Sequence, residues 1–243
     1  MPKFVDLHTH ILSRTDDGAL DKEQMYAMLD MAYEDGTRAL CATPHYFPKL
    51  FGDNTEAADR AFAELVAYSA KYPDFTLYRG NELYYTHENV QAAFEGKCLR
   101  IADSRYLLLE FDPDIGFFDM RAALSAVAGR GMFPLLAHTE RYTCLYKDPE
   151  RLELLRAQEC ACFQVNASSL FGGWGRKCAK FALYLIKRGY ASVVASDAHG
   201  TEQRKPILSG GYAFVARKFG EATAQMLFYE NPLMILENKP LYK

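Results

Sequence analysis

Hydrophobic residues along the chain fall into short runs that are separated by longer stretches of mixed character. Seven of these runs are rich in Val, Leu, Phe and Tyr and have the length of buried β-strands. The predicted strands are residues 4–7, 38–43, 75–80, 105–111, 133–137, 162–165 and 191–195. We therefore expect a chain whose scaffold is a set of short, buried strands.

The intervening stretches have the spacing of amphipathic helices. Predicted helices cover residues 20–33, 56–72, 121–131, 149–158 and 175–188. The first places Leu20, Met25, Met28, Leu29 and Ala32 on one face, and the second does the same with Ala58, Phe62, Leu65, Val66 and Ser69. Gly36, Gly131 and Gly189 follow such stretches, where a helix end favours a left-handed residue.

Strands and helices that alternate over the whole length predict parallel strands with crossover helices. Seven such units in about 240 residues fit an α/β fold of one domain over 1–243, a distorted (β/α)7 barrel of the TIM type. An open doubly wound sheet is the alternative. The first strand is followed by neither a GxGxxG nor a GxxxxGK[ST] loop, so a nucleotide-binding fold has no motif to support it.

Composition narrows the function classes. The chain has 243 residues, of which 49% are hydrophobic, and a formal net charge of -3. Such an acidic balance argues against nucleic acid as a partner. The N-terminus lacks the features of a signal peptide, and runs such as Leu107-Leu108-Leu109 are too short to span a membrane. We expect a cytoplasmic protein that is not embedded in a membrane.

The six cysteines form no CxxC pair, so reduced, mostly buried thiols are expected rather than a zinc ribbon or a redox dithiol. A cysteine phosphatase needs an arginine six residues after its cysteine, and no cysteine here has one. A GxSxG nucleophile elbow is also missing. Covalent catalysis by cysteine or serine is therefore not supported.

Polar side chains of one chemical kind stand where the predicted strands end. In chain order they are His8 and His10, His45, Glu82, Glu110, His138, and finally Asp197 and His199. Each of these residues alone is most simply a hydrogen-bonded polar group. In a parallel barrel, however, all these strand ends lie on one face, which is where active sites form.

Imidazole and carboxylate groups together suggest a metal site. In His8-x-His10 and Asp197-x-His199, the alternation of an extended chain puts both side chains on the same side. Nitrogen and oxygen ligands without thiolate favour manganese, iron or zinc at a functional site. The sequence thus predicts a metal cluster at the carboxyl ends of the strands.

The ordered set of motifs resembles a known family. The motifs are Asp6-Leu7-His8-Thr9-His10, Asp16-Asp17-Gly18, Thr43-Pro44-His45, Gly80-Asn81-Glu82, Leu109-Glu110-Phe111, Ala137-His138-Thr139-Glu140-Arg141-Tyr142, Gln164-Val165-Asn166 and Ser196-Asp197-Ala198-His199. They are similar to the PHP (polymerase and histidinol phosphatase) superfamily, and more closely to its bacterial capsule or exopolysaccharide protein-tyrosine phosphatases. The resemblance runs from Phe4 to about Leu236.

This resemblance implies a ligand set for three metal ions, typically manganese. The matching positions are His8, His10, Asp17, His45, Glu82, Glu110, His138, Asp197 and His199. Glu82 would bridge ions, whereas the residue pattern alone predicts only a turn at Asp17. Arg141 and Arg204 match the family's phosphate-contacting arginines. Thr139 departs from the family, which more often has proline there, and Ser13-Arg14 is a more polar pair than usual.

The resemblance also implies a substrate and a partner. The substrate would be phosphotyrosine on the tail of a cognate bacterial tyrosine kinase that regulates capsule or exopolysaccharide synthesis. The alternatives are a small-molecule phosphatase similar to histidinol phosphatase, a regulatory domain without activity and, more distantly, a nuclease.

Several residues near the ligands have no assigned chemistry. His87 is expected at the solvated start of a helix. Tyr46, Phe47, Tyr84 and Tyr85 would form either an aromatic rim or part of the core, and Asn166 would line the pocket. The role of Trp174, in a glycine-rich segment, stays open.

Overall fold

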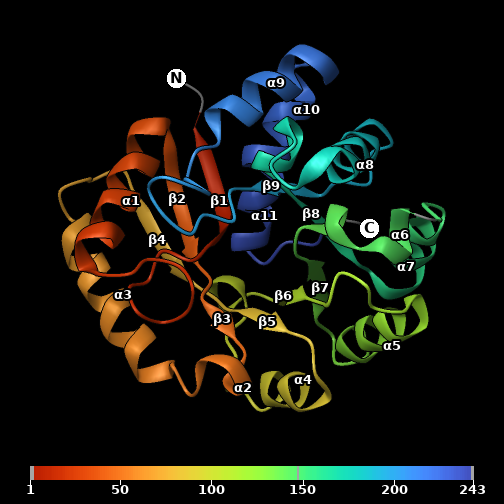
Figure 1. The fold of residues 1–243 in the computed structure, drawn as a ribbon, viewed down its shortest axis with the longest axis horizontal. Coiled ribbons are helices and arrows are strands. Elements are labelled where there is room, and N and C mark those ends of the chain that lie inside the picture. Colours follow the sequence, from red (N-terminus) through yellow and green to blue (C-terminus); the bar gives the residue numbers. More distant parts are fainter. Residues whose placement is uncertain (1–2, 147, 242–243) are drawn as a thin grey trace.

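The hydrophobic runs form parallel strands in the computed structural model, which describes residues 3–146 and 148–241. Every pair of neighbouring strands in this part of the chain is parallel. The strands are β1 (Phe4–Thr9), β2 (Thr37–Ala42), β3 (His45–Tyr46), β4 (Thr76–Arg79), β5 (Glu82–Tyr84), β6 (Tyr106–Glu110), β7 (Phe133–Leu136), β8 (Cys162–Asn166) and β9 (Val193–Ala195). The strands lie at the centre of the molecule, with helices around them (Figure 1).

Two of the seven predicted strands are each followed, just beyond the predicted range, by a second short strand that the sequence did not predict. Pro44 has no N–H to donate, and the second strand is interrupted there between β2 and β3. The third is interrupted between β4 and β5, where the Asn81 side chain donates to the Pro44 carbonyl (3.1 Å). The strands consequently divide into a sheet of order β1-β2-β4 and a sheet of order β3-β5-β6-β7-β8-β9.

Hydrogen bonds between the first and last strands close the ring. The Asp197 amide donates to the His8 carbonyl (2.9 Å), and the His10 amide donates to the Ala198 carbonyl (2.8 Å). The prediction of a distorted (β/α)7 TIM-like barrel is therefore confirmed, and the open doubly wound alternative is wrong.

The five predicted helices are present, with ends shifted by a few residues. They are α1 (Lys22–Asp35), α3 (Thr55–Ser69), α5 (Phe117–Ala128), α7 (Arg151–Glu159) and α8 (Gly175–Lys187). The structure adds α2 (Pro48–Phe51), α4 (His87–Phe94), α6 (Thr143–Tyr146), α9 (Ser209–Phe219), α10 (Glu221–Gln225) and α11 (Asn231–Leu236). A π-helical turn, η4 (Met226–Glu230), joins α10 to α11, and three 3-10 turns are η1 (Ile101–Asp103), η2 (Thr139–Arg141) and η3 (Ala167–Phe171).

The glycines predicted to follow helices are left-handed, as expected. Gly36 has φ 111° and its N–H donates to the carbonyls at the end of α1, as expected of a left-handed cap. Two burial predictions are wrong. Leu20 is 73% exposed because α1 begins only at Lys22, after the Asp21 cap, and Val66 is 44% exposed because it is turned about 100° from the buried Leu65.

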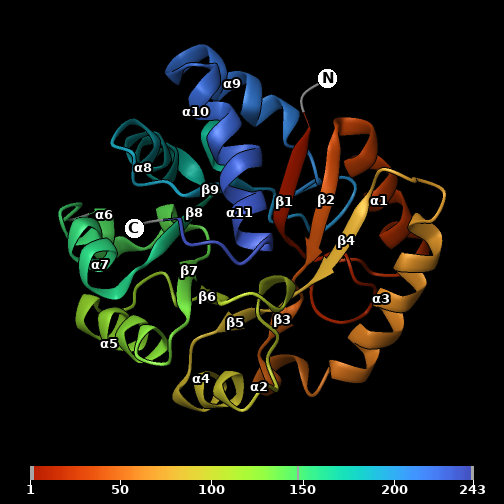
Figure 2. The same ribbon diagram turned by 180° about the vertical axis from the view of Figure 1, so that it is seen from behind.

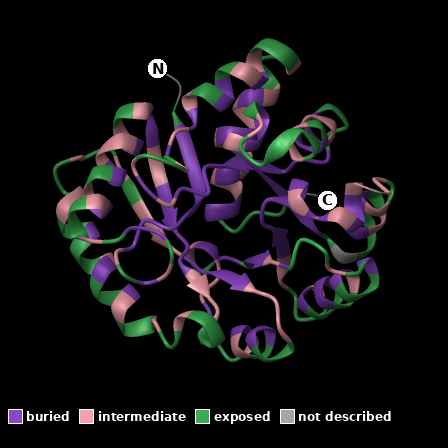
Figure 3. Ribbon diagram, viewed as in Figure 1, coloured by how far each residue is buried: buried purple, intermediate pink, exposed green. Residues whose placement is uncertain are grey.

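The interior of the ring is filled by side chains from several strands. This cluster contains Val5, Leu7, Cys41, Tyr106, Leu108, Leu135, Ala137, Cys162 and Val193, with Ile101 from η1 and with Ile235 and Leu236 from α11. Figure 2, from behind, shows α11 lying across the end of the ring at which the strands begin. Figure 3 shows that most strands are buried, that β3 and β4 are only partly so, and that the helices are exposed on their outer sides. The opposite end, where the strands finish, is left for polar groups.

Four of the six cysteines, Cys41, Cys98, Cys144 and Cys162, are buried, as expected. Burial raises the pKa of the Cys162 thiol to about 12, which makes it a poor nucleophile at neutral pH. Within residues 3–146 and 148–241, we find no helix with the length and apolar character needed to cross a lipid bilayer.

Candidate metal centre

The nine residues predicted as ligands come together at the carboxyl ends of the strands. His8 lies on β1, His45 begins β3, Glu82 begins β5 and Glu110 ends β6. The other five, His10, Asp17, His138, Asp197 and His199, lie in the segments that follow β1, β7 and β9. Residues separated by up to about 190 positions in the sequence thus form one group.

Glu82 lies at the middle of this group. Its Oε2 is 3.2 Å from His8 Nε2, 3.1 Å from His10 Nε2 and 3.2 Å from His45 Nδ1. Its Oε1 is 3.0 Å from His138 Nε2. A carboxylate whose two oxygens face four imidazoles has the placement expected of a bridging ligand.

Three further carboxylates surround this centre. Glu110 Oε2 lies 3.6 Å from His45 Nδ1, and Asp17 Oδ1 lies 3.5 Å from His45 Nε2 and from His199 Nε2. Asp197 Oδ1 is 3.4 Å from His8 Nε2. The two imidazoles of His8-x-His10 lie side by side as expected, since His8 Nε2 and His10 Nε2 are 3.1 Å apart.

Three sets of ligand atoms within the cluster are close enough to hold a metal ion. In each set all atoms lie within 4.8 Å of one another. The sets are His10, Asp17, His45 and His199; His8, His10 and Glu82; and His45, Glu82 and Glu110. The two other predicted ligands border them, His138 through Glu82 and Asp197 through His8.

The electrostatics of the cluster favour bound cations. Burial works against ionised Glu82, yet His8, His45 and the other imidazoles outweigh it and hold the pKa of Glu82 well below its usual range. Burial likewise opposes a charged His138, but Glu110 and Glu82 raise the pKa of this imidazole to about 9. Within the protein alone, Glu82 thus favours its ionised form and His138 its protonated form.

Several ligand atoms have no other partner. Among the described residues, His45 Nδ1, Asp197 Oδ1 and His199 Nε2 are buried and make no hydrogen bond. Buried polar atoms are nearly always satisfied, so an unpaired group of this kind requires a partner. Imidazole nitrogens and carboxylate oxygens that face one another fit a cluster of divalent ions.

Asp16 holds His10 in place, a role that sequence reasoning missed. Asp16 Oδ2 lies 2.7 Å from His10 Nδ1 and accepts from the His45 amide (2.8 Å). The carboxylate keeps the proton on Nδ1, so that Nε2 faces the cluster with its lone pair. Gly18 allows the turn, because a Cβ there would lie 2.0 Å from the His10 carbonyl oxygen. In the sequence, the adjacent Asp16-Asp17 pair was the feature that pointed to a second functional carboxylate here.

Gln164 and Asn166 support the cluster from β8. Gln164 Oε1 accepts from the His138 amide (2.7 Å) and lies 3.2 Å from His8 Nδ1, which orients the His8 ring. Asn166 accepts from Gln164 Nε2 (2.6 Å) and donates to Asp197 Oδ2 (2.7 Å). Both side chains are buried, and Asn166 connects Gln164 to Asp197 instead of lining an open pocket.

Three residues of the site have a strained backbone. His138, Asp197 and Arg204 have φ values of 32°, 53° and 50°, a region that residues other than glycine seldom occupy. Such strain is typical of positions whose geometry serves a function. Thr139, the departure from the family pattern, donates from Oγ to the Leu136 carbonyl (3.2 Å) and so contributes to the turn.

Both predicted arginines lie at the edge of the cluster. Arg204 Nη2 is 2.7 Å from Asp197 Oδ2, and Arg141 Nη1 is 3.9 Å from Glu110 Oε1. Each guanidinium therefore stands beside one predicted ligand. Both side chains are partly exposed, which leaves them accessible to a bound anion.

Aromatic side chains next to β3 and on β5 stack in pairs. The Phe51 ring stacks on His45, with centroids 5.4 Å apart, and Phe47 stacks on Tyr84 at 4.3 Å. Tyr85 instead packs on the buried Phe111. The sixth histidine, His87, is exposed at the start of α4, as expected.

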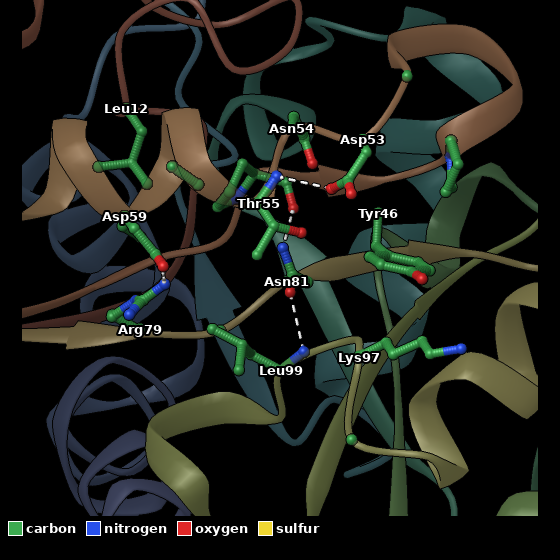
Figure 4. A pocket seen from close by; sticks show the side chains of 17 residues that line it. Leu12, Tyr46, Asp53, Asn54, Thr55, Asp59, Arg79, Asn81, Lys97 and Leu99 are labelled. Atoms are coloured by element: carbon green, nitrogen blue, oxygen red, sulfur yellow. Dashed lines mark hydrogen bonds and ion pairs between the residues drawn. The ribbon is translucent and has the colours of Figure 1, made fainter.

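A separate pocket of about 600 Å³ lies behind the segment that carries His45 (Figure 4). Tyr46 and Asn54 contribute to its wall, and Arg79 pairs there with Asp59. Asn54 Nδ2 donates to the His45 carbonyl (3.0 Å), which ties the pocket wall to the cluster. None of the nine predicted ligands is among the residues that line it. The pocket is therefore distinct from the metal centre.

A closed ring of parallel strands with imidazoles and carboxylates at its carboxyl end defines a PHP-type enzyme with a TIM-barrel-like fold. Residues 4–237 match the sequence model of the family described as "Capsular polysaccharide synthesis, CpsB/CapC", and the chain belongs to this family. The resemblance inferred from the motifs is thereby confirmed.

Similar proteins span nearly the same length. The tyrosine-protein phosphatase CpsB of Streptococcus pneumoniae is 29% identical over 238 residues, covering 96% of this chain and 98% of its own. The tyrosine-protein phosphatase YwqE of Bacillus subtilis is 29% identical over 249 residues, covering 99% and 94%.

Solved structures agree with this assignment. A crystal structure from a study of YwqE and CpsB, described as unique metal-dependent tyrosine phosphatases, superposes with a TM-score of 0.88. It is 28% identical and covers 98% of this chain and 96% of that one. The lactonase Lmo2620 of Listeria monocytogenes, with a TM-score of 0.64 and 11% identity, shares only the fold.

Proposed function

We propose that this chain is a metal-dependent tyrosine-protein phosphatase, a phosphoric monoester hydrolase. The observation that carries the proposal is the convergence of nine predicted ligands on Glu82, with Arg141 and Arg204 at the edge. The family membership and the activities named for CpsB and YwqE support the same reading.

The nine residues would hold up to three divalent ions, with manganese preferred and iron or zinc compatible with the ligands. When bound, such ions polarise the phosphate ester and lower the pKa of a water molecule. His8, His10 and His45 are aligned for this role by Glu82, while Asp16 and Gln164 fix the ring orientations of His10 and His8.

The protein's own groups would select and orient a phosphate dianion. Asp17, Glu82, Glu110 and Asp197 would offset four of the six positive charges of three divalent ions, leaving a site that attracts an anion. Arg141 and Arg204 can each donate a pair of parallel hydrogen bonds to phosphate oxygens. The aromatic pair Phe47 and Tyr84 offers a half-buried surface for a tyrosine ring.

In the cell, we propose that the substrate is the phosphotyrosine-bearing tail of a cognate tyrosine kinase that regulates capsule or exopolysaccharide synthesis. A cytoplasmic location would give access to that tail. We further propose that residues 1–243 form a single PHP phosphoesterase domain, of which residues 1–2, 147 and 242–243 lie outside the described part.

The proposal is tested by measuring phosphate release from a phosphotyrosine peptide with protein reloaded with Mn²⁺. A His8→Ala/His10→Ala variant should lose the activity, because it lacks two of the imidazoles that face Glu82. His87→Ala is the matched control, since this histidine is exposed and lies outside the cluster.

Turnover of the peptide by the wild type and by His87→Ala, but not by the double variant, would support the proposal. Turnover of histidinol phosphate alone would instead make the protein a small-molecule phosphatase. No turnover of either compound, with bound metal verified, would contradict a phosphatase function.

A further inference from the structure

The loop between η3 and α8 is built to hold Trp174 in one place. Gly172 and Gly175 adopt left-handed φ values of 87° and 88°, which suit glycine. Between them, a Cβ at Gly173 would lie 3.0 Å from the Ser168 carbonyl oxygen, so the loop runs tightly against η3. Trp174 follows at the N-cap of α8 and is 37% exposed.

Trp174 contacts both arginines of the site. The Cζ atom of Arg141 lies 4.2 Å from the centroid of the indole ring, and that of Arg204 lies 5.4 Å from it. Both distances are within the range of a cation–π interaction, and tryptophan is the strongest aromatic partner for one. One side chain therefore links two arginines that come from η2 and from the segment after β9.

The two arginines need such a shared partner. Two guanidinium groups next to one ring repel each other, and among the described residues each pairs with one carboxylate, Glu110 for Arg141 and Asp197 for Arg204. Arg204 Nε is moreover buried without a hydrogen-bond partner among the described residues. A phosphate oxygen would satisfy this donor.

Buried hydrogen bonds tie the Trp174 loop to the turn that carries Arg141. Glu140 Oε1 accepts from Ser169 Oγ (2.6 Å) and from the Asn166 amide (3.0 Å), and this carboxylate is fully buried. The Ser169 carbonyl in turn accepts from the Gly172 amide (3.1 Å). The loop and η2 are consequently held as one unit, and the indole is fixed relative to Arg141.

We propose that Trp174 is a positioning residue that holds Arg141 and Arg204 toward one phosphate group. This inference deepens the proposed function and rests on it for the nature of the substrate. It also gives the site an internal probe, because Trp174 is the only tryptophan of the chain. An anion that draws the two guanidinium groups toward itself changes the electrostatic field at the indole.

The first test is intrinsic fluorescence of the Mn²⁺-loaded protein during a titration with inorganic phosphate. The emission of the wild type should change with saturation, and an Arg141→Lys/Arg204→Lys variant should lose the response. This readout needs no turnover, so it separates a failure of the inference from a failure of the phosphotyrosine assignment. Emission that ignores phosphate while phosphate inhibits the enzyme would overturn the inference.

The second test compares Trp174→Leu with Trp174→Phe on a phosphotyrosine peptide. Leucine is apolar but has no π face, and it should raise KM and the inhibition constant of phosphate roughly tenfold with a smaller change in kcat. Phenylalanine should restore most of the affinity. Phe171→Leu is the control, because Phe171 is 61% exposed at the end of η3, next to the loop, and packs on Phe214 instead.

Equal kinetics for the leucine and phenylalanine variants would overturn the inference. So would a loss of bound manganese or a lower melting temperature in Trp174→Leu that accounts for its defect, since the tryptophan would then be merely structural. A rise in KM with unchanged metal content and melting temperature, rescued by phenylalanine, would establish the positioning role.

Discussion

Single side chains behind the cluster decide how its imidazoles point. Asp16 faces His10 Nδ1 at 2.7 Å, and Gln164 faces His8 Nδ1 at 3.2 Å. In both cases the outer partner keeps the proton on one nitrogen and leaves the other for a ligand. The residues next to a ligand therefore matter as much for metal affinity as some ligands do.

We expect Asp16→Asn to weaken manganese binding by about tenfold to hundredfold. The amide can accept at one end only, whereas Asp16 accepts at both oxygens, from Gly18 and from His45. Calorimetric titration of Mn²⁺ into metal-free protein measures the change. Asp53→Asn, a nearby carboxylate outside the cluster, is the control, and equal affinity in both variants would argue against the assigned role.

A polar contact joins α1 to the last turn of α3 and to the segment that follows it. Asp30 on α1 accepts from Tyr68 (2.8 Å) and Tyr72 (3.0 Å) and pairs with Lys71 (2.7 Å). Burial opposes the charge of Asp30, but these partners outweigh it and lower the pKa of the carboxyl group. The contact holds α1 and α3 together on the outside of β2 and β4.

Asp30→Asn should reduce the free energy of unfolding by roughly 1–2 kcal/mol at pH 7. Since the pKa of Asp30 is lower in the folded state, its stabilisation is complete above the unfolded value of about 4 and is lost as the pH falls through the folded value. Urea unfolding at pH 7 and at about pH 3 should therefore show a difference that shrinks in acid.

Glu34→Gln on the same helix is the matched control for this experiment, because Glu34 is exposed. A difference between wild type and Asp30→Asn that stays constant with pH would show that the carboxylate charge is not what links α1 to α3.

Helix α11 covers one end of the ring of strands, and the cluster of predicted metal ligands lies at the other end. Ligands from β1, β3, β5 and β6 and from the segments after β7 and β9 meet within a few ångströms. Bound cations would join strands from the entire ring, and their removal would leave the buried carboxylates with only imidazoles facing them.

Removal of metal by a chelator should therefore lower the melting temperature, and Mn²⁺ should restore it. Ions present at a hundred times their Kd stabilise by about 2.7 kcal/mol, which corresponds to roughly 5–10 °C for a chain of this size. Scanning calorimetry measures the shift. The His8→Ala/His10→Ala variant should show a much smaller one; a wild-type melting temperature that chelation leaves unchanged would refute this link between metal and fold.

The positions of the strands follow from short-range patterns, which is why they could be predicted. The apolar runs and the polar residues directly after them are local features, and a parallel barrel places all such ends on one face. The helices after residue 188 were harder to foresee, since α9, α10 and α11 are short and α10 continues through a π-turn into α11. Their burial depends on the strands they cover.

The sequence pattern by itself determined the alternation of strands and helices, the ring of strand ends and eight of the residues that meet there, whereas Asp17 was added only by the family resemblance. Only the tertiary structure showed what surrounds them. Strand pairing is interrupted at Pro44 and Asn81, and Asp16 and Gln164 orient the imidazoles of His10 and His8. Arg141 and Arg204 both contact the ring of Trp174. These contacts join residues whose pairing no local periodicity encodes, because they exist only once the ring has closed.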